Sequence, residues 1–256
     1  MAKKAQVTNF VVLGVVIILI IVLVYFISGQ RSTKSLLLQS NKVNKDVERL
    51  NAFFLDCIEL VGEEAVYYVG QHGGYFDLSN NSIFGVPYYL FDGKISMPTR
   101  QDIENEISSY MEEALPYCGF DFIENMTFDP NEMDAKFNTN IFDERVLIKT
   151  EQQLSIELDG VRYNLNDFET ELPIKLGLMH DSANSFVRGN FGNETQMCIG
   201  CLLEDLKKKE LHGMISFSDD GTIIYTVIDP EYVLRDRYEL GLIGFGNYNF
   251  KFAIRY

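Results

Sequence analysis

Four cysteines, Cys57, Cys118, Cys198 and Cys201, are the residues whose type and spacing could most readily do chemistry. Four oxidised cysteines allow three pairings. We expect one disulfide between Cys57 and Cys118, which would join two predicted helices, and a local one between Cys198 and Cys201. Closing the long loop from Cys57 to Cys118 would stabilise the fold by about 4 kcal/mol, because it restricts the unfolded chain.

The Cys198-Ile-Gly-Cys201 motif permits two other interpretations. A Cys-x-x-Cys pair ahead of a predicted helix resembles the site of thioredoxin-type oxidoreductases, in which the helix N-terminus favours the thiolate. Against this, the chain contains no Trp, the motif lies late in the chain, and no βαβ unit precedes it. A zinc site is disfavoured because structural zinc usually takes two close ligand pairs, and Cys57 and Cys118 lie far apart.

The three histidines, His72, His180 and His212, do not have the spacing of metal ligands on one helix face. His72 lies in a glycine-rich segment and is expected to be a turn residue. No glycine-rich loop joins a strand to a helix, and no Ser has the surroundings of a nucleophile elbow. We therefore expect no metal, no cofactor and no catalytic residues, and the sequence does not predict an enzyme.

Three Asn-x-Ser/Thr sequons begin at Asn80, Asn125 and Asn193. Such sequons accept glycans when they lie in surface loops outside the cytoplasm. Asn193 is the best placed of the three, because residues 190–198 are polar, contain glycine and are predicted to form a loop.

The elements that position these residues begin with an uncharged apolar stretch, residues 10–28 (FVVLGVVIILIIVLVYFIS). At a rise of 1.5 Å per residue, this stretch is just long enough to cross a hydrocarbon core of about 30 Å. It exceeds the usual apolar region of a signal peptide, about 7–15 residues, and no small-x-small cleavage pattern follows it. We expect an uncleaved transmembrane helix in the lipid bilayer, with residues 1–9 as a short cytoplasmic tail.

The acidic charge balance limits the partners of the remaining chain. The net charge is −15, and the part after residue 30 carries 20 basic against 37 acidic residues. Such a domain is not expected to bind nucleic acid or an anionic lipid surface. Basic residues flank both sides of the apolar stretch, so they orient it only weakly. The even number of cysteines favours an extracytoplasmic C-terminal domain.

The N-terminus supports the same orientation through a resemblance. Lys4-Ala5-Gln6-Val7, directly before the apolar stretch, resembles the leader of archaeal type IV pilin-like precursors. The resemblance implies cleavage between Ala5 and Gln6 on the cytoplasmic side, with the apolar helix retained as an anchor. Phe10 stands where many pilins carry a glutamate. The alternative is a short basic flank on a signal anchor, which needs no peptidase.

Residues 29–70 are predicted to form one long amphipathic helix that continues out of the membrane. Apolar residues recur from Val43 to Tyr68 at steps of three and four, which places them on one stripe. Gly70 and the pair Gly73-Gly74 are expected to end the helix. We expect the stripe to pack on the protein's own domain; a coiled-coil seam is the alternative.

Residues 71–256 are predicted to form an α+β ectodomain of antiparallel β-hairpins with two or three shorter helices, with 71–135 and 136–256 as candidate subdomains. Asp-Gly turns predict three hairpins, at Asp92-Gly93, Asp159-Gly160 and Asp220-Gly221. Residues 141–176 are expected to be a β region. The predicted helices are one capped by Thr99 and Asp102, and a short one over 202–211. The alternating residues 248–256 predict a half-buried final strand.

This order of leader, anchor, long helix, capped helix and β domain resembles a group of uncharacterised archaeal single-span membrane proteins, over about residues 1–176. The resemblance implies architecture and a cell-membrane location only. We expect a membrane-anchored cell-surface or envelope protein with a structural or interaction role, which contacts a protein, a glycan or copies of itself. The aromatic strand faces and the turn at 66–76 are the expected contact surfaces. The alternatives are a pilin-like filament subunit and a membrane-tethered thiol oxidoreductase that uses Cys198 and Cys201.

Overall fold

A computed structural model describes most of the chain after the predicted membrane segment. It divides the chain into two compact units, Met1–Ala52 and Phe53–Tyr256. In the first unit only residues 48–52 are described, and they are helical. The described residues are 48–78, 81–117, 135–151, 155–158, 161–164, 167–190, 198–233 and 246–255.

One long helix is described over residues 48–71, and its part from Phe53 onward is central to the second unit. The apolar stripe of this part is buried within its own unit, as the sequence predicts, and Phe54 and Ala65 are fully buried. A Cβ at Gly62 would lie 3.0 Å from Cδ1 of Ile148, which shows how closely the helix meets the strand that carries Ile148. The expected packing on the protein's own domain is therefore confirmed for residues 53–71.

The predicted end of this helix is confirmed, and its local cause is a glycine cap. The helix runs to residue 71, and Gly73 and Gly74 follow with φ angles of 56° and 88°. Gly74 N–H donates to Val69 O at 2.8 Å, and Gly73 N–H donates to Gly70 O at 3.1 Å. These two bonds form a Schellman motif, which requires the left-handed backbone that glycine adopts most easily.

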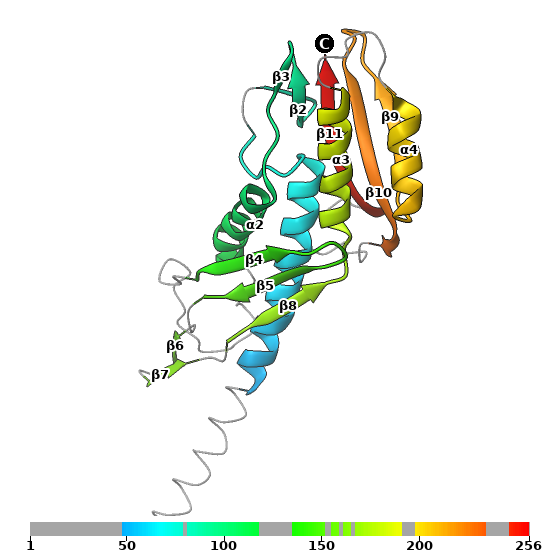
Figure 1. The fold of residues 1–256 in the computed structure, drawn as a ribbon. Helices are drawn as coiled ribbons and strands as arrows, with labels where there is room; N and C mark the ends of the chain where they lie inside the picture. Colours follow the sequence, from blue (N-terminus) through cyan, green and yellow to red (C-terminus); the bar gives the residue numbers. More distant parts are fainter. Residues whose placement is uncertain are drawn as a thin grey trace, which may run out of the picture. The chain divides into compact units, whose positions relative to one another are not determined.

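A six-stranded sheet is the larger of the two main sheets (Figure 1). Its strand order is β1-β2-β11-β10-β9, and β3 pairs with β2 off this path. The first hairpin is confirmed, because Phe91 pairs with Lys94 across the two-residue turn Asp92-Gly93. The hairpin β9–β10 is also confirmed. The strands are β1 (Ser82–Ile83), β2 (Val86–Phe91), β3 (Lys94–Ile95), β9 (His212–Phe217), β10 (Ile223–Val233) and β11 (Asn247–Arg255).

The last strand has the predicted alternation but an unexpected neighbour. Strand β11 pairs with β10 in the antiparallel direction and with β2 in the parallel direction, with Ala253 opposite Tyr88. The sequence predicted only antiparallel hairpins. A parallel pair needs a long connection, and here nearly the whole domain lies between the two strands.

The aromatic face of the six-stranded sheet is core, not surface. Tyr89, Phe252 and Tyr225 stack in a row, with ring centroids 5.1 Å apart at both steps, and each is at most 1% exposed. Phe186 packs edge-on against Tyr225 at 5.0 Å. The expectation that the aromatic strand faces are contact surfaces is therefore wrong for this face, because its rings pack against one another in the core.

A second, three-stranded antiparallel sheet has the order β4-β5-β8 and packs on the long helix. The predicted β region 141–176 is partly confirmed, and β4 begins earlier, at Phe137. The second predicted hairpin is seen as the pair β6–β7, with Leu158 opposite Val161, while its Asp159-Gly160 turn lies outside the described residues. The strands are β4 (Phe137–Ile141), β5 (Val146–Thr150), β6 (Ser155–Leu158), β7 (Val161–Asn164) and β8 (Glu169–Leu172).

Helix α2 (Arg100–Ala114), which is followed by the short 3-10 helix η1 (Leu115–Tyr117), begins at the predicted capping box. The Thr99 hydroxyl accepts from Asp102 N–H at 3.2 Å, and Asp102 Oδ2 accepts from Thr99 N–H at 2.7 Å. The predicted apolar face is largely buried, including Ile103 and Ile107. Ser108 on α2 is hydrogen-bonded to Thr139 on β4 at 2.9 Å, so this helix lies against the three-stranded sheet.

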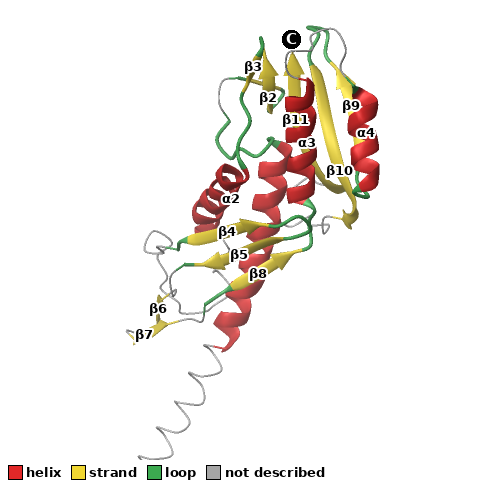
Figure 2. Cartoon of the chain, in the orientation of Figure 1, coloured by secondary structure: helices red, strands yellow, loops and turns green. Residues whose placement is uncertain are grey.

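Helix α3 (Leu176–Asn190) is absent from the sequence prediction, which ended its β region at residue 176. The helical spacing was present, since Leu176, Met179, Ala183 and Val187 are all fully buried. Helix α4 (Ile199–Lys208) was predicted as 202–211 but begins three residues earlier. Figure 2 shows α3 and α4 beside the strands of the six-stranded sheet.

The predicted transmembrane helix, residues 10–28, lies outside the described residues, as does the first part of the predicted helix 29–70. None of the helices in the described part of the chain combines the length and the apolar character that a bilayer crossing requires.

Candidate functional site

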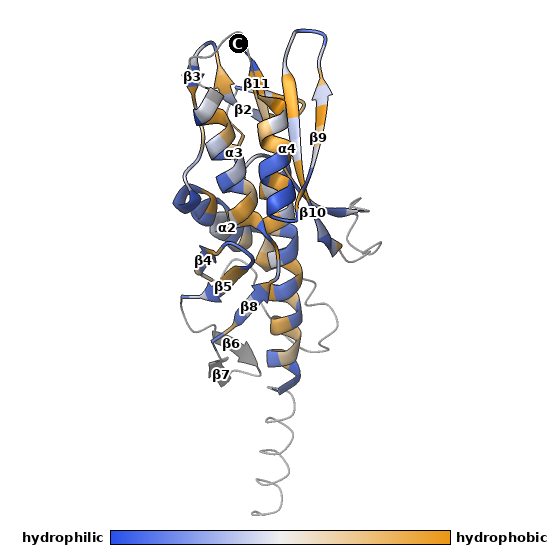
Figure 3. Cartoon of the chain, turned by 45° about the vertical axis from the view of Figure 1, so that its right-hand side comes forward, coloured by the Kyte–Doolittle hydropathy of each residue, from blue (hydrophilic) through white to orange (hydrophobic). Residues whose placement is uncertain are grey.

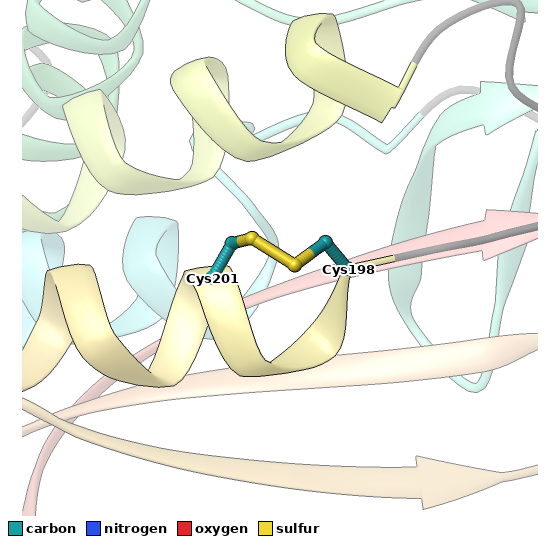
Figure 4. The surroundings of a disulfide bond; sticks show 2 residues. All are labelled: Cys198 and Cys201. Carbon is teal, nitrogen blue, oxygen red and sulfur yellow. A yellow bond between two sulfur atoms is a disulfide. The ribbon is translucent and has the colours of Figure 1, made fainter.

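The Cys-x-x-Cys motif forms an exposed disulfide at the beginning of α4 (Figure 4). Cys198 is the N-cap residue of the helix and Cys201 lies in its first turn, with their Cα atoms 5.2 Å apart. The N–H of Cys201 donates to Cys198 O at 3.0 Å, which closes the turn. Both cysteines are exposed, so an external thiolate could reach either sulfur. The expected local disulfide is thus present.

The helix behind this disulfide is fixed by packing on two neighbours. Leu202 and Leu206 are buried, and a Cβ at Gly213 of β9 would lie 2.9 Å from a methyl carbon of each of Leu203 and Leu206. Lys209, the C-cap residue, donates to Ser182 of α3 and to Asp205 of its own helix, both at 2.8 Å.

The electrostatic setting of Cys198 suits thiol chemistry. The first turn of α4 contains no acidic residue, and its basic residues Lys207 and Lys208 lie in the last turn. The positive end of the helix dipole therefore faces Cys198 without a neighbouring carboxylate from the same turn. A helix N-terminus favours the thiolate form of a cysteine, so the reduced pair could act as a nucleophile and a resolving thiol.

Cys57 is also disulfide-bonded. It lies on the long helix and is only 4% exposed. Its expected partner, Cys118, lies outside the described residues, so the pairing Cys57–Cys118 stays a prediction. A buried cystine serves to hold elements together, whereas an exposed one can exchange with other thiols.

The other predicted site residues cannot be placed in the fold. The cleavage pair Ala5 and Gln6 and the three sequon residues lie outside the described residues. The three sequon residues are Asn80, Asn125 and Asn193.

The three histidines lie apart in the fold and serve different local purposes. His72 is the C-cap of the long helix, with Nδ1 2.8 Å from Tyr68 O, so its expected role as a turn residue is confirmed. His212 begins the outer strand β9 and is exposed. His180 is buried in α3, with Nε2 3.0 Å from Pro98 O. Among the described residues, no three His, Cys, Asp or Glu side chains are grouped so that they could hold a metal ion.

A polar cluster around Arg100 was not predicted from the sequence. The guanidinium lies 2.9 Å from Asp181 Oδ2 and 3.2 Å from Asp143 Oδ1, and it also donates to Ile141 O at 3.3 Å. It therefore joins the start of α2 to α3 and to the β4–β5 turn. The side chains of both aspartates are about half exposed or more, so each ion pair adds little stability by itself, and the cluster is best explained as a structural junction.

His180 lies next to this cluster. Its Nδ1 is buried without a hydrogen-bond partner among the described residues and lies 3.6 Å from Asp181 Oδ1. No spacing rule could have revealed the contacts of the cluster around Arg100, because its members come from three separate elements.

A second unpredicted cluster surrounds Lys175 at the start of α3. Its ammonium group lies 2.7 Å from Glu231 and 3.8 Å from Glu210, and its side chain is 11% exposed. The hydrogen bond to Glu231 raises the pKa of Lys175 and outweighs the opposing effect of desolvation. The buried carboxylate of Asp229 accepts from Lys175 N–H at 3.1 Å. This cluster pins the N-terminus of α3 to the bulged end of β10.

The turn at 66–76, an expected contact surface, is partly used inside the domain. Tyr68, Phe76 and Tyr110 of α2 pack together, with ring centroids 5.1 to 6.1 Å apart. Glu106 accepts from Phe76 N–H at 2.8 Å. These contacts tie the turn to α2 and leave the exposed disulfide as the strongest candidate for chemistry among the described residues.

Comparison with known proteins adds no relative. No family model matches the chain, and no curated protein and no solved structure shows significant similarity to it.

Proposed function

We propose that this chain is a membrane-anchored protein of the cell surface or envelope, with a structural or interaction role. Residues 10–28 would cross the bilayer, and the long helix that follows would carry the acidic α+β domain on the outer side. The observation that carries the proposal is the exposed cystine Cys198–Cys201, because exposed disulfides persist in oxidising compartments and are rare in the cytosol. The binding partner of the domain is a protein or a glycan.

Protease treatment of intact cells that produce the full chain tests this location. A protease that cannot cross the membrane is expected to remove the domain of residues 53–256 from intact cells, while a cytoplasmic marker protein stays whole. Protection of the domain in intact cells, with digestion only after lysis, would contradict the proposal. The loop that the sequence predicts between Asn190 and Cys198 provides a site at which a specific cleavage sequence can be inserted.

A second candidate function is thiol–disulfide exchange, and the position of Cys198 at the N-cap of α4 favours it. In this scheme a substrate thiolate attacks one sulfur of the Cys198–Cys201 disulfide and forms a mixed disulfide, and the other cysteine leaves as a thiolate. A second thiol of the same substrate resolves the mixed disulfide. Two electrons and two protons pass from the substrate dithiol to the cysteine pair, and the substrate becomes a disulfide.

Oxidation of a dithiol peptide by the purified protein distinguishes this function from an inert staple. The exchange function predicts that the peptide becomes oxidised in a stoichiometric amount and that the variant Cys198→Ser/Cys201→Ser does not oxidise it. If the unchanged protein oxidises the peptide no faster than the double variant does, thiol exchange is excluded and the structural or interaction role remains.

A further inference from the structure

Strand β9 (His212–Phe217) is an edge of the six-stranded sheet, and no other described strand pairs with its outer side. Five of its six residues are exposed, with Met214 54% and Phe217 73% exposed. The strand contains no Pro and no Asp, Glu, Lys or Arg, which are the usual devices that keep an edge strand from pairing. Figure 3 shows β9 as the outer strand beside β10.

The edge strand β8 of the other sheet shows the contrast. It carries Glu169 and Glu171, whose carboxylates lie 2.8 Å from Lys149 and 3.8 Å from Arg145. Charges of this kind make strand pairing at an edge costly. Among the described residues, charges therefore protect the β8 edge, whereas the β9 edge lacks such protection.

The register of the β9–β10 ladder shows which backbone groups of β9 are available. Ser218 N–H donates to Thr222 O at 2.9 Å, in the same register that pairs Phe217 with Ile223. Hydrogen-bonded and non-hydrogen-bonded pairs alternate along an antiparallel ladder. The even-numbered residues of β9 thus bond to β10, and the N–H and C=O groups of Gly213, Ile215 and Phe217 point away from the sheet.

We propose that two copies of the protein pair through β9 in the antiparallel direction, with Ile215 opposite Ile215 of the second copy. A two-fold axis perpendicular to the sheet requires that opposed residues lie on the same face, and this register satisfies it. Each Gly213 then faces Phe217 of the second copy, so the outward N–H and C=O groups of all three residues bond to the partner strand. The two six-stranded sheets become one continuous sheet.

The side chains fit this register. The side chains of Leu203 and Leu206 of α4 lie directly over Gly213, where a Cβ would be 2.9 Å from each. Leu203 is 42% exposed. Phe217 lies on the same face of β9, because it is four positions after Gly213 and side chains alternate between the two faces of a strand. In the pair, each Phe217 ring packs against the exposed side of Leu203 in the other copy, beside Gly213.

The charges at the two ends of β9 are complementary. The exposed Asp219 follows the strand at one end, and the exposed lysines Lys207 and Lys208 precede it at the other. Antiparallel pairing brings Asp219 of each copy toward the lysines of the other. Glu210 at that end is acidic but lies 3.8 Å from Lys175 of its own chain. The net charge of −15 opposes association only weakly at physiological salt, where charges more than about 8 Å apart are largely screened.

The mass of the full chain in detergent, measured by light scattering after size-exclusion chromatography, tests the proposal. We expect a dimer for the unchanged protein and for Phe84→Lys, which alters a phenylalanine that is 85% exposed in the β1–β2 turn. We expect Phe217→Lys to weaken the dimer at least tenfold. A monomeric unchanged protein at micromolar concentration, or a dimer that Phe217→Lys leaves intact, would overturn the proposal.

Crosslinking tests the register without dependence on stability. Opposed residues of a hydrogen-bonded antiparallel pair have Cα atoms about 5.5 Å apart, within the range that a disulfide spans. Ile215→Cys is therefore expected to form a crosslinked dimer on mild oxidation. Met214→Cys is not, because Met214 lies opposite Ser216 of the second copy and only diagonally across from the second Met214. A failure of Ile215→Cys to crosslink, or equal crosslinking of both variants, would overturn the proposed pairing.

Discussion

Gly70 of the long helix lies directly against the side chain of Tyr248 of β11, at the opposite end of the domain sequence. A Cβ at Gly70 would overlap Oη of Tyr248 and would lie 3.0 Å from the carbonyl oxygen of Asn249. The Tyr248 hydroxyl donates to Val66 O at 3.2 Å, one helical turn earlier. This contact joins the first helix of the domain to its last strand, so the two ends of the domain sequence pack together.

Gly70→Ala is expected to destabilise the domain by about 2 kcal/mol, because overpacking of a tight contact usually costs 1–3 kcal/mol. Gly189→Ala is the matched control: Gly189 also lies in a helix but has nothing within 4 Å of its Cβ position. There the change should stabilise the protein by up to about 1 kcal/mol. Urea denaturation measures both, and equal effects of the two changes would contradict the contact.

A double-mutant cycle measures how much of the cost of Gly70→Ala comes from the Tyr248 hydroxyl. Tyr248→Phe removes the hydroxyl that the new Cβ of Gly70→Ala would overlap. We expect Tyr248→Phe alone to cost about 1 kcal/mol through its lost hydrogen bond, and the double variant to be more stable than the two single effects predict. Strict additivity of the two changes would show that the helix and β11 do not meet at this point.

The alkaline limit of stability follows from the buried tyrosines. Burial is the main cause that raises the pKa of Tyr248 above its ordinary value, and the nearby Asp229 acts in the same direction. Because the folded-state pKa exceeds the unfolded value of about 10, this contribution is fully present below pH 10 and is lost as pH rises above it. Between pH 8 and pH 11, the free energy of unfolding should decrease less in Tyr248→Phe than in the unchanged protein. An equal decrease in both proteins would contradict the burial of this hydroxyl.

The capping box of α2 is predicted to contribute measurably to stability. Thr99→Ala should cost about 1 kcal/mol, since the helix loses the acceptor for Asp102 N–H. Gln101→Ala, an exposed change in the same turn, should stay within about 0.5 kcal/mol. The Thr99 hydroxyl, with the Thr99 N–H, lowers the pKa of Asp102, so the difference between the two variants should shrink as pH falls below about 4. Thermal melts at pH 7 and pH 3 measure this difference. An equal difference in stability between Thr99→Ala and Gln101→Ala at both pH values would show that Asp102 takes no part.

The two kinds of cystine should differ in reactivity. Mild reduction of the folded protein, followed by alkylation, is expected to label the exposed Cys198 and Cys201 first, because Cys57 is only 4% exposed. Loss of the short ring that they close should cost no more than about 2 kcal/mol on the loop-entropy estimate, so the fold should survive. Peptide mass mapping gives the order of labelling, and earlier labelling of Cys57 would argue against the described packing of the long helix.

Much of the local structure could be predicted because short segments carry their own signals. The glycines at 73 and 74 predicted the end of the long helix, and Asp92-Gly93 predicted the first hairpin. Thr99 and Asp102 predicted the start of α2. Each of these signals acts between residues within one turn of the backbone.

The features that could not be predicted depend on contacts between distant residues. The parallel pairing of β11 with β2 places Ala253 beside Tyr88, and no local pattern indicates which strands become neighbours. The contacts of Arg100 with Asp143 and Asp181 also come from separate elements. Helix α3 differs from these features, because its buried residues had helical spacing that a closer analysis of residues 176–190 could have recognised.

The redox state of the cysteines and the identity of the N-terminal residue test most directly whether an N-terminal anchor holds the domain outside the cytoplasm. The intact mass of the membrane-extracted protein is determined after alkylation, with and without prior reduction. We predict that alkylation adds no mass before reduction and labels four cysteines after it. A mass that corresponds to a chain beginning at Gln6 would in addition favour the pilin-like form of the anchor. Four free thiols on a chain that begins at Met1 or Ala2 would contradict the extracytoplasmic domain.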